Sequence, residues 1–180
     1  MRIAAGRDMD MPPKVRVGKE KILDKAFAMT KENGFACITA RSLADGLNCS
    51  TQPIFRVYEN MEMLRQDLCG EVQRYFVEHV VGAGKTYTEM GMSYIELARK
   101  EEKLFQLLCT TVMEKETEYC IFDGLPDING LQEDGKHELS MMVWVFTHGI
   151  ASNVANHQIH LSEEEVKELL VKAYQAFKAV

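Results

Sequence analysis

The most informative polar run in the sequence is Ser-Thr-Gln-Pro at residues 50–53. Hydroxyl groups can bind base edges or phosphates, and a glutamine amide can bind adenine through two hydrogen bonds. Arg41 and Arg56 stand on either side of the run, where their charges could neutralise phosphates. These residue types and spacings suit a DNA-reading helix, but three-helix packing without DNA accounts for them equally well.

The residues with metal-binding or redox chemistry form weaker patterns. His157 and His160 fall in a predicted turn without a cysteine beside them, which favours a solvated loop over a metal site. The five cysteines are odd in number and include no CxxC pair, so buried free thiols are favoured over disulfides or a redox sensor. No Ser/His/Asp or Cys/His catalytic arrangement and no glycine-rich phosphate loop is evident in the sequence. We therefore expect no enzyme activity, no metal and no cofactor.

Three short helices are expected to position the polar run. Apolar spacing and cap residues place them at residues 18–33, 40–46 and 50–58. Thr39 is expected to cap the second helix and Ser50 the third, with Asn48 in a left-handed turn between them. The apolar side of the third helix is expected to comprise Ile54, Phe55 and Tyr58.

The remainder of the chain is also predicted to be helical. Helices are expected at residues 61–81, 87–100, 103–115, 136–156 and 162–180, with a loop or broken helix at 117–135. Asn60 and Ser162 are expected caps. The predicted fold class is all-α, with an N-terminal three-helix helix-turn-helix head and a C-terminal helical body for ligand binding and dimerisation. The expected domains are a flexible basic arm (1–17), a DNA-binding domain (18–60) and a ligand-binding and dimerisation domain (61–180).

Charge is distributed unevenly along the chain. The net charge is −6, yet residues 1–60 carry ten Lys and Arg against seven Asp and Glu. A mildly basic head on an acidic body suits a DNA-binding regulator, although an acidic protein with no DNA role could share it. No apolar stretch is long enough for a membrane span, and the first residues lack the apolar core of a secretory signal, so we expect a cytoplasmic protein without a membrane partner.

The segment LADGLNCSTQPIFRVYENMEML, residues 43–64, resembles the signature of TetR/AcrR-family transcriptional regulators. Five positions depart from that pattern. Asn48 replaces the usual turn glycine, Gln52-Pro53 replaces a common Gly-x pair, Phe55 replaces a tyrosine that often touches phosphate, and Met61 replaces a lysine. The departures predict a modest, strongly salt-dependent affinity for DNA.

The resemblance implies a ligand-responsive regulator, expected to be a repressor, that binds a palindromic operator in double-stranded DNA as a homodimer. The expected DNA-binding residues are Thr39, Arg41, Ser50, Thr51, Gln52, Pro53, Phe55, Arg56 and Tyr58. A small apolar ligand is expected among Leu68, Val72, Tyr75, Leu104, Leu108, Met113, Trp144 and His148. Self-association is expected through residues 136–156 and 162–180. The alternative is a helical ligand- or protein-binding module that has lost specific DNA binding.

Overall fold

The computed structural model describes residues 17–82, 84–110 and 133–179, and over these ranges the chain is helical without a strand. The predicted all-α class is confirmed. The elements are α1 (Lys19–Asn33), the 3₁₀ helix η1 (Phe35–Cys37), α2 (Ala40–Gly46), α3 (Gln52–Val57), α4 (Met61–Val80), α5 (Tyr87–Lys100), α6 (Glu102–Thr110), α7 (Glu133–Ala155) and α8 (Glu163–Lys178).

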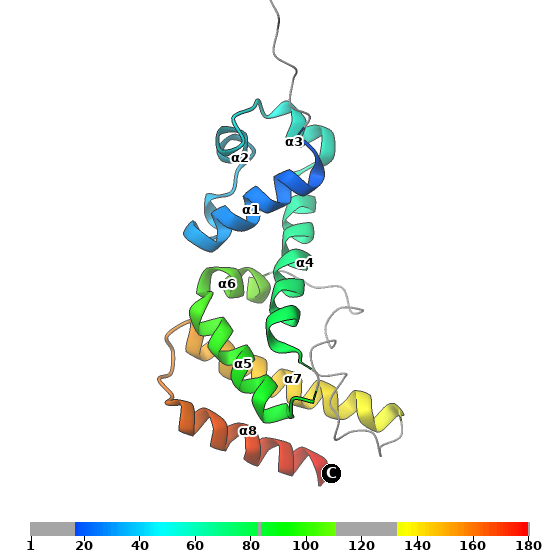
Figure 1. Ribbon diagram of the computed structural model, residues 1–180, viewed down its shortest axis with the longest axis vertical. Coiled ribbons are helices and arrows are strands. Elements are labelled where there is room, and N and C mark those ends of the chain that lie inside the picture. Colours follow the sequence, from blue (N-terminus) through cyan, green and yellow to red (C-terminus); the bar gives the residue numbers. More distant parts are fainter. Residues whose placement is uncertain (1–16, 83, 111–132, 180) are drawn as a thin grey trace, which may run out of the picture.

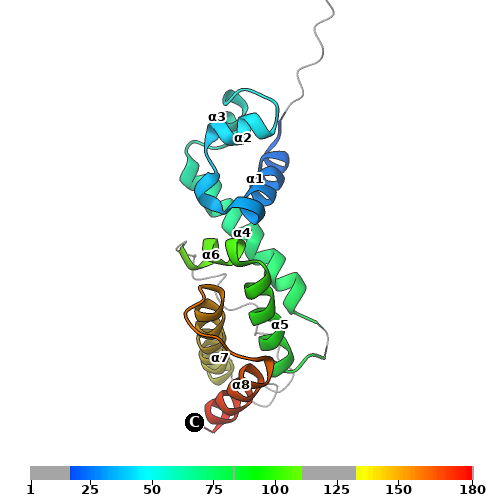
Figure 2. The same cartoon turned by 90° about the vertical axis from the view of Figure 1, so that its left-hand side faces the viewer.

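The molecule is elongated, with α1–α3 at one end and α5–α8 at the other (Figure 1). We call these the head and the body. The long helix α4 starts in the head and continues into the body, so it connects the two (Figure 1). At the far end from the head, α7 and α8 lie against each other and against α5 (Figure 2). None of the described helices combines the length and apolar character that a membrane crossing requires.

Local hydrogen bonds explain where several helices begin. The Ser42 backbone N–H donates to the Thr39 hydroxyl at 3.0 Å at the start of α2. The Met63 N–H donates to the Asn60 side chain at 3.0 Å at the start of α4. Ser162 receives the equivalent bond at α8, so these three predicted caps are confirmed.

The predicted cap of the third helix is wrong by one residue. Thr51, rather than Ser50, precedes the first residue of α3, and its side chain makes no capping bond. The reason is that the backbone of Thr51 is already helical, with φ of −69° and ψ of −17°, whereas the capping residues Thr39, Asn60 and Ser162 are extended. The Thr51 carbonyl accepts from the N–H groups of Ile54 and Phe55, at 3.1 and 3.2 Å. The helix therefore starts at Gln52, and Ser50 stays in the preceding turn.

Two further expectations concern the body. α7 begins at Glu133, three residues before the predicted start, so the end of the expected 117–135 loop is helical. The rest of that loop, residues 117–132, and the end of the helix predicted at 103–115, residues 111–115, lie outside the described residues. The basic arm also lies outside them, apart from Val17, which is buried.

A continuous apolar core joins the head to the body. It is built on the inward sides of α1, α2 and α3, continues along one side of α4, and ends among α5, α6, α7 and α8. Its fully buried members along α4 are Leu64, Leu68, Val72, Phe76 and Val80. Their regular spacing of four residues puts each member about one turn beyond the last, so a single buried stripe runs along the helix from the head to the body.

Polar contacts supplement this core where the head meets the body. The Lys31 ammonium on α1 lies 2.7 Å from the carboxylate of Glu101, which is only 8% exposed at the α5–α6 junction. Lys31 also donates to the Tyr75 hydroxyl at 3.4 Å and lies 5.2 Å from the centre of that ring. The hydrogen bond with Glu101 is the main reason that the pKa of Lys31 is raised. Lys103 adds a bond to the Glu32 carbonyl.

Candidate nucleic-acid interface

Helix α3 presents a polar face with one aromatic ring to solvent. Gln52, Phe55 and Arg56 are exposed, whereas Ile54 and Tyr58 are buried at 0% and 3% exposure. The buried pair is spaced i, i+4, so it anchors one side of the short helix in the core. The opposite side, which Gln52 occupies centrally, is therefore free to meet a partner.

The turn between α2 and α3 sets the direction of α3. Asn48 adopts a left-handed backbone with φ of 52°, as its residue type predicts. The Cys49 N–H then reaches back to the carbonyl of Ala44 at 2.9 Å and closes the turn. A tight turn followed by a helix with an exposed face is the arrangement of a helix-turn-helix.

Phe55 does not lie on the apolar side of the third helix, and that prediction is wrong. Its ring is 53% exposed. Because α3 is anchored by Ile54 and Tyr58, the 100° step from Ile54 to Phe55 turns the ring out of the core. The predicted apolar side therefore consists of Ile54 and Tyr58 alone.

Tyr58, in contrast to Phe55, is buried. Its ring belongs to the buried core, and the Lys19 ammonium lies 5.9 Å from the ring centre. Burial is the main cause that raises the pKa of its hydroxyl. The expected contact between Tyr58 and DNA finds no support in this geometry, because the side chain has almost no exposed surface to offer.

Three polar side chains of the predicted DNA-binding set differ in whether they already have hydrogen-bond partners within the protein. Arg41 is exposed on α2. Arg56 is exposed too, but its guanidinium donates to the Val17 carbonyl at 3.4 Å and so ties the start of the described chain to α3. The Thr39 hydroxyl is engaged with Ser42 in the α2 cap. Within the described part of the chain, Arg41 is the only one of these three that makes no such contact.

A surface hollow of about 830 Å³ lies beside the exposed face of α3. It is bounded by the start of α1, the turn and α3, with the lining Val17, Lys21, Leu47, Asn48, Cys49, Ser50, Gln52, Pro53, Phe55 and Arg56. Five of the nine predicted DNA-binding residues therefore meet at one hollow: Ser50, Gln52, Pro53, Phe55 and Arg56. Thr51 is half-buried just behind them.

In the body, two of the predicted pocket residues stack on each other. The rings of Trp144 and His148 on α7 are 5.2 Å apart, and His148 also lies 5.2 Å from Phe105. His148 uses both ring nitrogens, with the Tyr94 hydroxyl 2.9 Å from Nδ1 and the Cys109 sulfur 3.8 Å from Nε2. Burial lowers the pKa of His148 and raises the pKa of Cys109, so both are neutral near pH 7.

The other predicted pocket residues are more dispersed. Leu68, Val72, Leu104 and Leu108 are buried in the core. Tyr75 is half-buried at the junction with the head, beside Lys31 and Glu101. Met113 lies outside the described residues.

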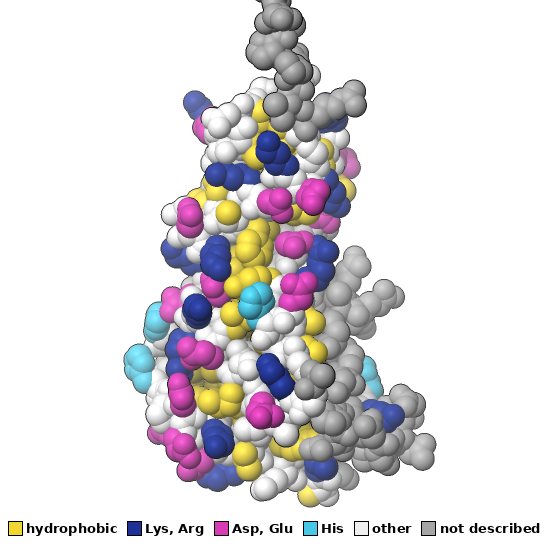
Figure 3. All heavy atoms as spheres, in the orientation of Figure 1, with side chains coloured by type: hydrophobic (Ala, Val, Ile, Leu, Met, Phe, Trp, Pro, Cys, Tyr) yellow, Lys and Arg dark blue, Asp and Glu magenta, His cyan; other side chains and the backbone are white. Residues whose placement is uncertain are grey.

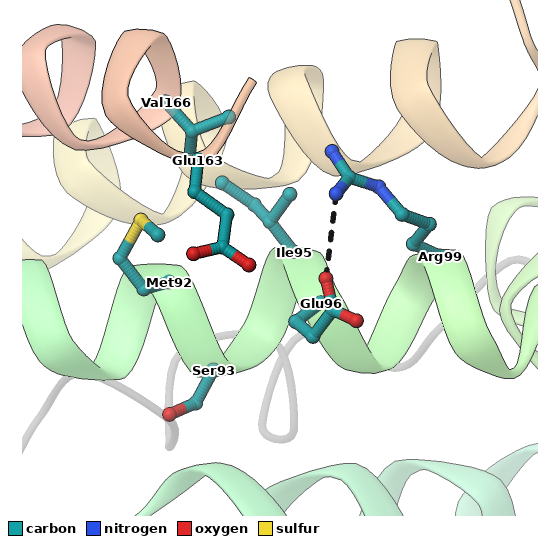
Figure 4. A pocket seen from close by; sticks show the side chains of 7 residues that line it. All are labelled: Met92, Ser93, Ile95, Glu96, Arg99, Glu163 and Val166. Atoms are coloured by element: carbon teal, nitrogen blue, oxygen red, sulfur yellow. Dashed lines mark hydrogen bonds and ion pairs between the residues drawn. The ribbon is translucent and has the colours of Figure 1, made fainter. Parts of the chain in front are cut away.

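A separate surface pocket of about 270 Å³ lies between α5 and α8 (Figure 4). Met92, Ile95 and Val166 form its apolar side, and the carboxylate of Glu163 extends over it from α8. Arg99 lies 3.4 Å from Glu96 and also donates to the Leu161 carbonyl at 3.1 Å, which holds the loop before α8. This pocket shares no residue with the predicted one.

The predicted turn with two histidines is exposed at both residues. His157 lies 3.2 Å from a carboxylate oxygen of Glu102. Within the described ranges, no three His, Cys, Asp or Glu side chains gather in a way that could hold a metal ion.

Comparison with solved structures decides the fold. No family model and no curated protein matches the chain by sequence. The solved structures that match include two that align over nearly the whole chain. One is a variant of TetR from Acinetobacter baumannii AYE in complex with minocycline, at a TM-score of 0.66 and 12% identity, covering 91% of this chain and 94% of that one. The other is a TetR-like transcriptional regulator from Rhodococcus sp. RHA1, at a TM-score of 0.61 and 15% identity, covering 94% and 98%.

The chain has the TetR-like fold.

Within this TetR-like fold, sequence reasoning missed two residues beside the stacked pair in the body. Tyr94 and Cys109 contact His148 across sequence separations of 54 and 39 residues. Helical periodicity had placed neither of them near His148, because it reports only which residues share one helix face. Finding them requires information on which residues of different helices contact each other.

Proposed function

We propose that this protein is a DNA-binding transcriptional regulator that reads the major groove with the exposed face of α3. The observation that carries the proposal is the anchoring of α3 by Ile54 and Tyr58, which leaves Gln52 at the centre of an outward face. A glutamine in this position can make paired hydrogen bonds to adenine, and the exposed Arg41 on α2 can contact phosphate. Ser50, Thr51, Pro53, Phe55 and Arg56 complete the proposed surface, and Thr39 flanks it.

We further propose that two copies pair through α7 and α8 to place two heads on a palindromic operator. Met141 and Val145 lie one helical turn apart on α7 and are 37% and 55% exposed, and Leu169 on α8 is 37% exposed. Exposed apolar side chains on adjacent helices are typical of surfaces that become buried on association. Two recognition helices in such a dimer would meet DNA about 34 Å apart, one helical turn.

The proposed regulation is release of the operator when a small apolar ligand binds the body, which makes the protein a repressor acting in the cytoplasm. The stacked rings of Trp144 and His148 offer aromatic surface beside the Tyr94–His148 hydrogen bond, and aromatic lining is typical of ligand sites. The Acinetobacter neighbour, which has this fold, is in complex with minocycline, and this supports a ligand-responsive role. The pocket between α5 and α8 is a second place where a ligand could bind (Figure 4).

The experiment is selection of duplex DNA from a random pool by the purified protein, followed by affinity measurements at several salt concentrations. Gln52→Ala is expected to change which sequences bind, because the amide contacts a base edge. Arg41→Ala is expected to weaken all sequences alike and to reduce the slope of log affinity against log salt by about one. Identical behaviour of the two variants would contradict these roles.

The alternative function is a helical ligand- or protein-binding module without specific DNA binding. It is favoured by the exposed ring of Phe55 and by Met61 near the start of α4, both at positions where a polar or basic group would strengthen a phosphate contact. Basic and acidic side chains are also interspersed on the face shown in Figure 3, rather than separated into a basic patch. Failure of the selection to enrich any sequence at low salt would establish this alternative.

A further inference from the structure

Phe55 is the most unusual side chain on the exposed face of α3. Among the large apolar side chains of the described residues, only Val145 exposes more of its surface, at 55% against 53%. Leaving an aromatic ring in water forgoes the free energy that its burial would provide. The neighbouring positions Ile54 and Tyr58 show that α3 has a core-facing side, so the outward position of this ring is specific to residue 55.

The exposed side chains beside the ring are suited to hydrogen bonding, whereas the apolar Val17, Leu47 and Cys49 of the same hollow are buried or half-buried. Gln52 precedes it by three residues and therefore lies on the same helix face. Arg56 follows it, and Ser50 and Asn48 border the same hollow of about 830 Å³. Pro53 is the only other apolar member contributed to this hollow by α3. A partner of this surface must therefore offer polar groups with an apolar group among them.

Major-groove edges of DNA have that chemistry. Each base pair presents hydrogen-bond donors and acceptors, and the apolar group among them is the C5 methyl of thymine. The ring of Phe55 has no hydroxyl, so it cannot donate a hydrogen bond to a phosphate oxygen. Covering a methyl group removes apolar surface from water, which favours binding. The helix rises about 4.5 Å between positions 52 and 55, against about 3.4 Å per base pair, so the two side chains would meet the same or adjacent base pairs.

We propose that Phe55 is a specificity-determining residue that reads a thymine methyl group next to the base contacted by Gln52. The inference rests on the proposed DNA-binding function. It predicts an operator half-site in which one thymine is required for its methyl group rather than for its hydrogen-bonding atoms.

The test uses the full-length protein and a site selected from random, unmethylated duplex DNA. Each thymine of that site is replaced in turn by deoxyuridine, which removes the methyl group and leaves the hydrogen-bonding groups unchanged. Affinity is measured by fluorescence anisotropy for the wild type, Phe55→Ala, Phe55→Leu and the control Ile159→Ala. Ile159 is a 38% exposed apolar residue of the body, in the segment between α7 and α8. Circular dichroism checks that each variant is folded.

The wild type is expected to lose about fourfold in affinity when the critical thymine loses its methyl group in one half-site, and about fifteenfold when both half-sites are changed. Ile159→Ala should keep that sensitivity, Phe55→Leu should keep part of it, and Phe55→Ala should bind the two DNAs equally. Wild-type indifference to every replacement would overturn the inference while leaving specific DNA binding established. Retention of full sensitivity by Phe55→Ala would also overturn it, by assigning the methyl contact to another residue such as Pro53. If no sequence is selected at all, the proposed function itself fails.

Discussion

Thr39 and Thr51 are identical residue types at the starts of two adjacent helices, yet only one of them makes a capping bond. The Thr39 hydroxyl accepts from the Ser42 N–H at 3.0 Å, and the Ser42 hydroxyl accepts from the Thr39 N–H at 2.9 Å. Thr51 has a helical backbone conformation already and makes no such bond. A side-chain oxygen contributes to helix stability only where the backbone leaves an N–H group within its reach.

This difference gives a stability prediction. Thr39→Ala is expected to lower the free energy of unfolding by about 1 kcal/mol, because the Ser42 N–H loses the hydroxyl that accepts its hydrogen bond at the start of α2. Thr51→Ala serves as the matched control and should change it by less than about 0.5 kcal/mol. Urea denaturation followed by circular dichroism measures both. An equal loss in the two variants would show that α2 does not depend on its cap.

At the scale of elements, the contact between α1 and the α5–α6 junction joins the head to the body. Glu101 is buried there, and the ammonium of Lys31 lies 2.7 Å from its carboxylate on a half-exposed side chain. A carboxylate that is removed from water keeps its charge at a low free-energy cost only if a cation or donor stays beside it. A ligand-driven shift of the body would therefore strain this contact, which makes it a candidate for coupling the body to the head.

Lys31→Met is expected to lower the free energy of unfolding by about 1–2 kcal/mol at pH 7. This is less than the ~3–5 kcal/mol of a fully buried pair, because Lys31 is half-exposed and solvent screens its charge. Lys172→Met is the control. It breaks the exposed Lys172–Glu168 pair on α8, whose atoms lie 2.9 Å apart, and should cost no more than about 0.5 kcal/mol. Comparable losses in urea denaturation would mean that burial of Glu101 contributes little.

At the scale of the whole molecule, the long helix α4 and the exposed apolar side chains of α7 and α8 determine how two copies could be arranged. The head and the proposed pairing surface lie at opposite ends of the molecule (Figures 1 and 2). A dimer paired at that end would leave both heads free for DNA. The affinity for a palindromic site would then depend on the dimer, because each head alone makes only half of the contacts.

Val145→Glu is expected to convert the protein to a monomer, because it would bury a charge in the proposed interface. Met63→Glu is the matched control, since Met63 is an apolar side chain of similar exposure, 44%, on α4 away from α7 and α8. Analytical ultracentrifugation measures both states. A dimeric Val145→Glu variant, or a wild type that is monomeric at micromolar concentration, would contradict pairing through this surface.

Much of the fold was predictable from local sequence alone. The helices around Thr39, Asn60 and Ser162 begin where the sequence indicates, because a capping bond joins residues only three positions apart. The left-handed backbone of Asn48 was predictable from its residue type, and so was a short helix after it, although the predicted cap of that helix was wrong by one residue. The position of the candidate DNA surface follows from these local features.

Tertiary structure decided what each side chain does within that frame. Phe55 lies outside and Tyr58 inside because the direction in which α3 packs selects its buried face, and six residues of sequence leave that direction open. The pairs Lys31–Glu101 and Tyr94–His148 form across 70 and 54 residues, so they exist only once separate helices have packed. Helix formation depends on residues close in sequence, whereas burial and pairing depend on residues far apart in sequence. The proposed reading of DNA through Phe55 depends on burial, because the packing of α3 leaves that ring exposed.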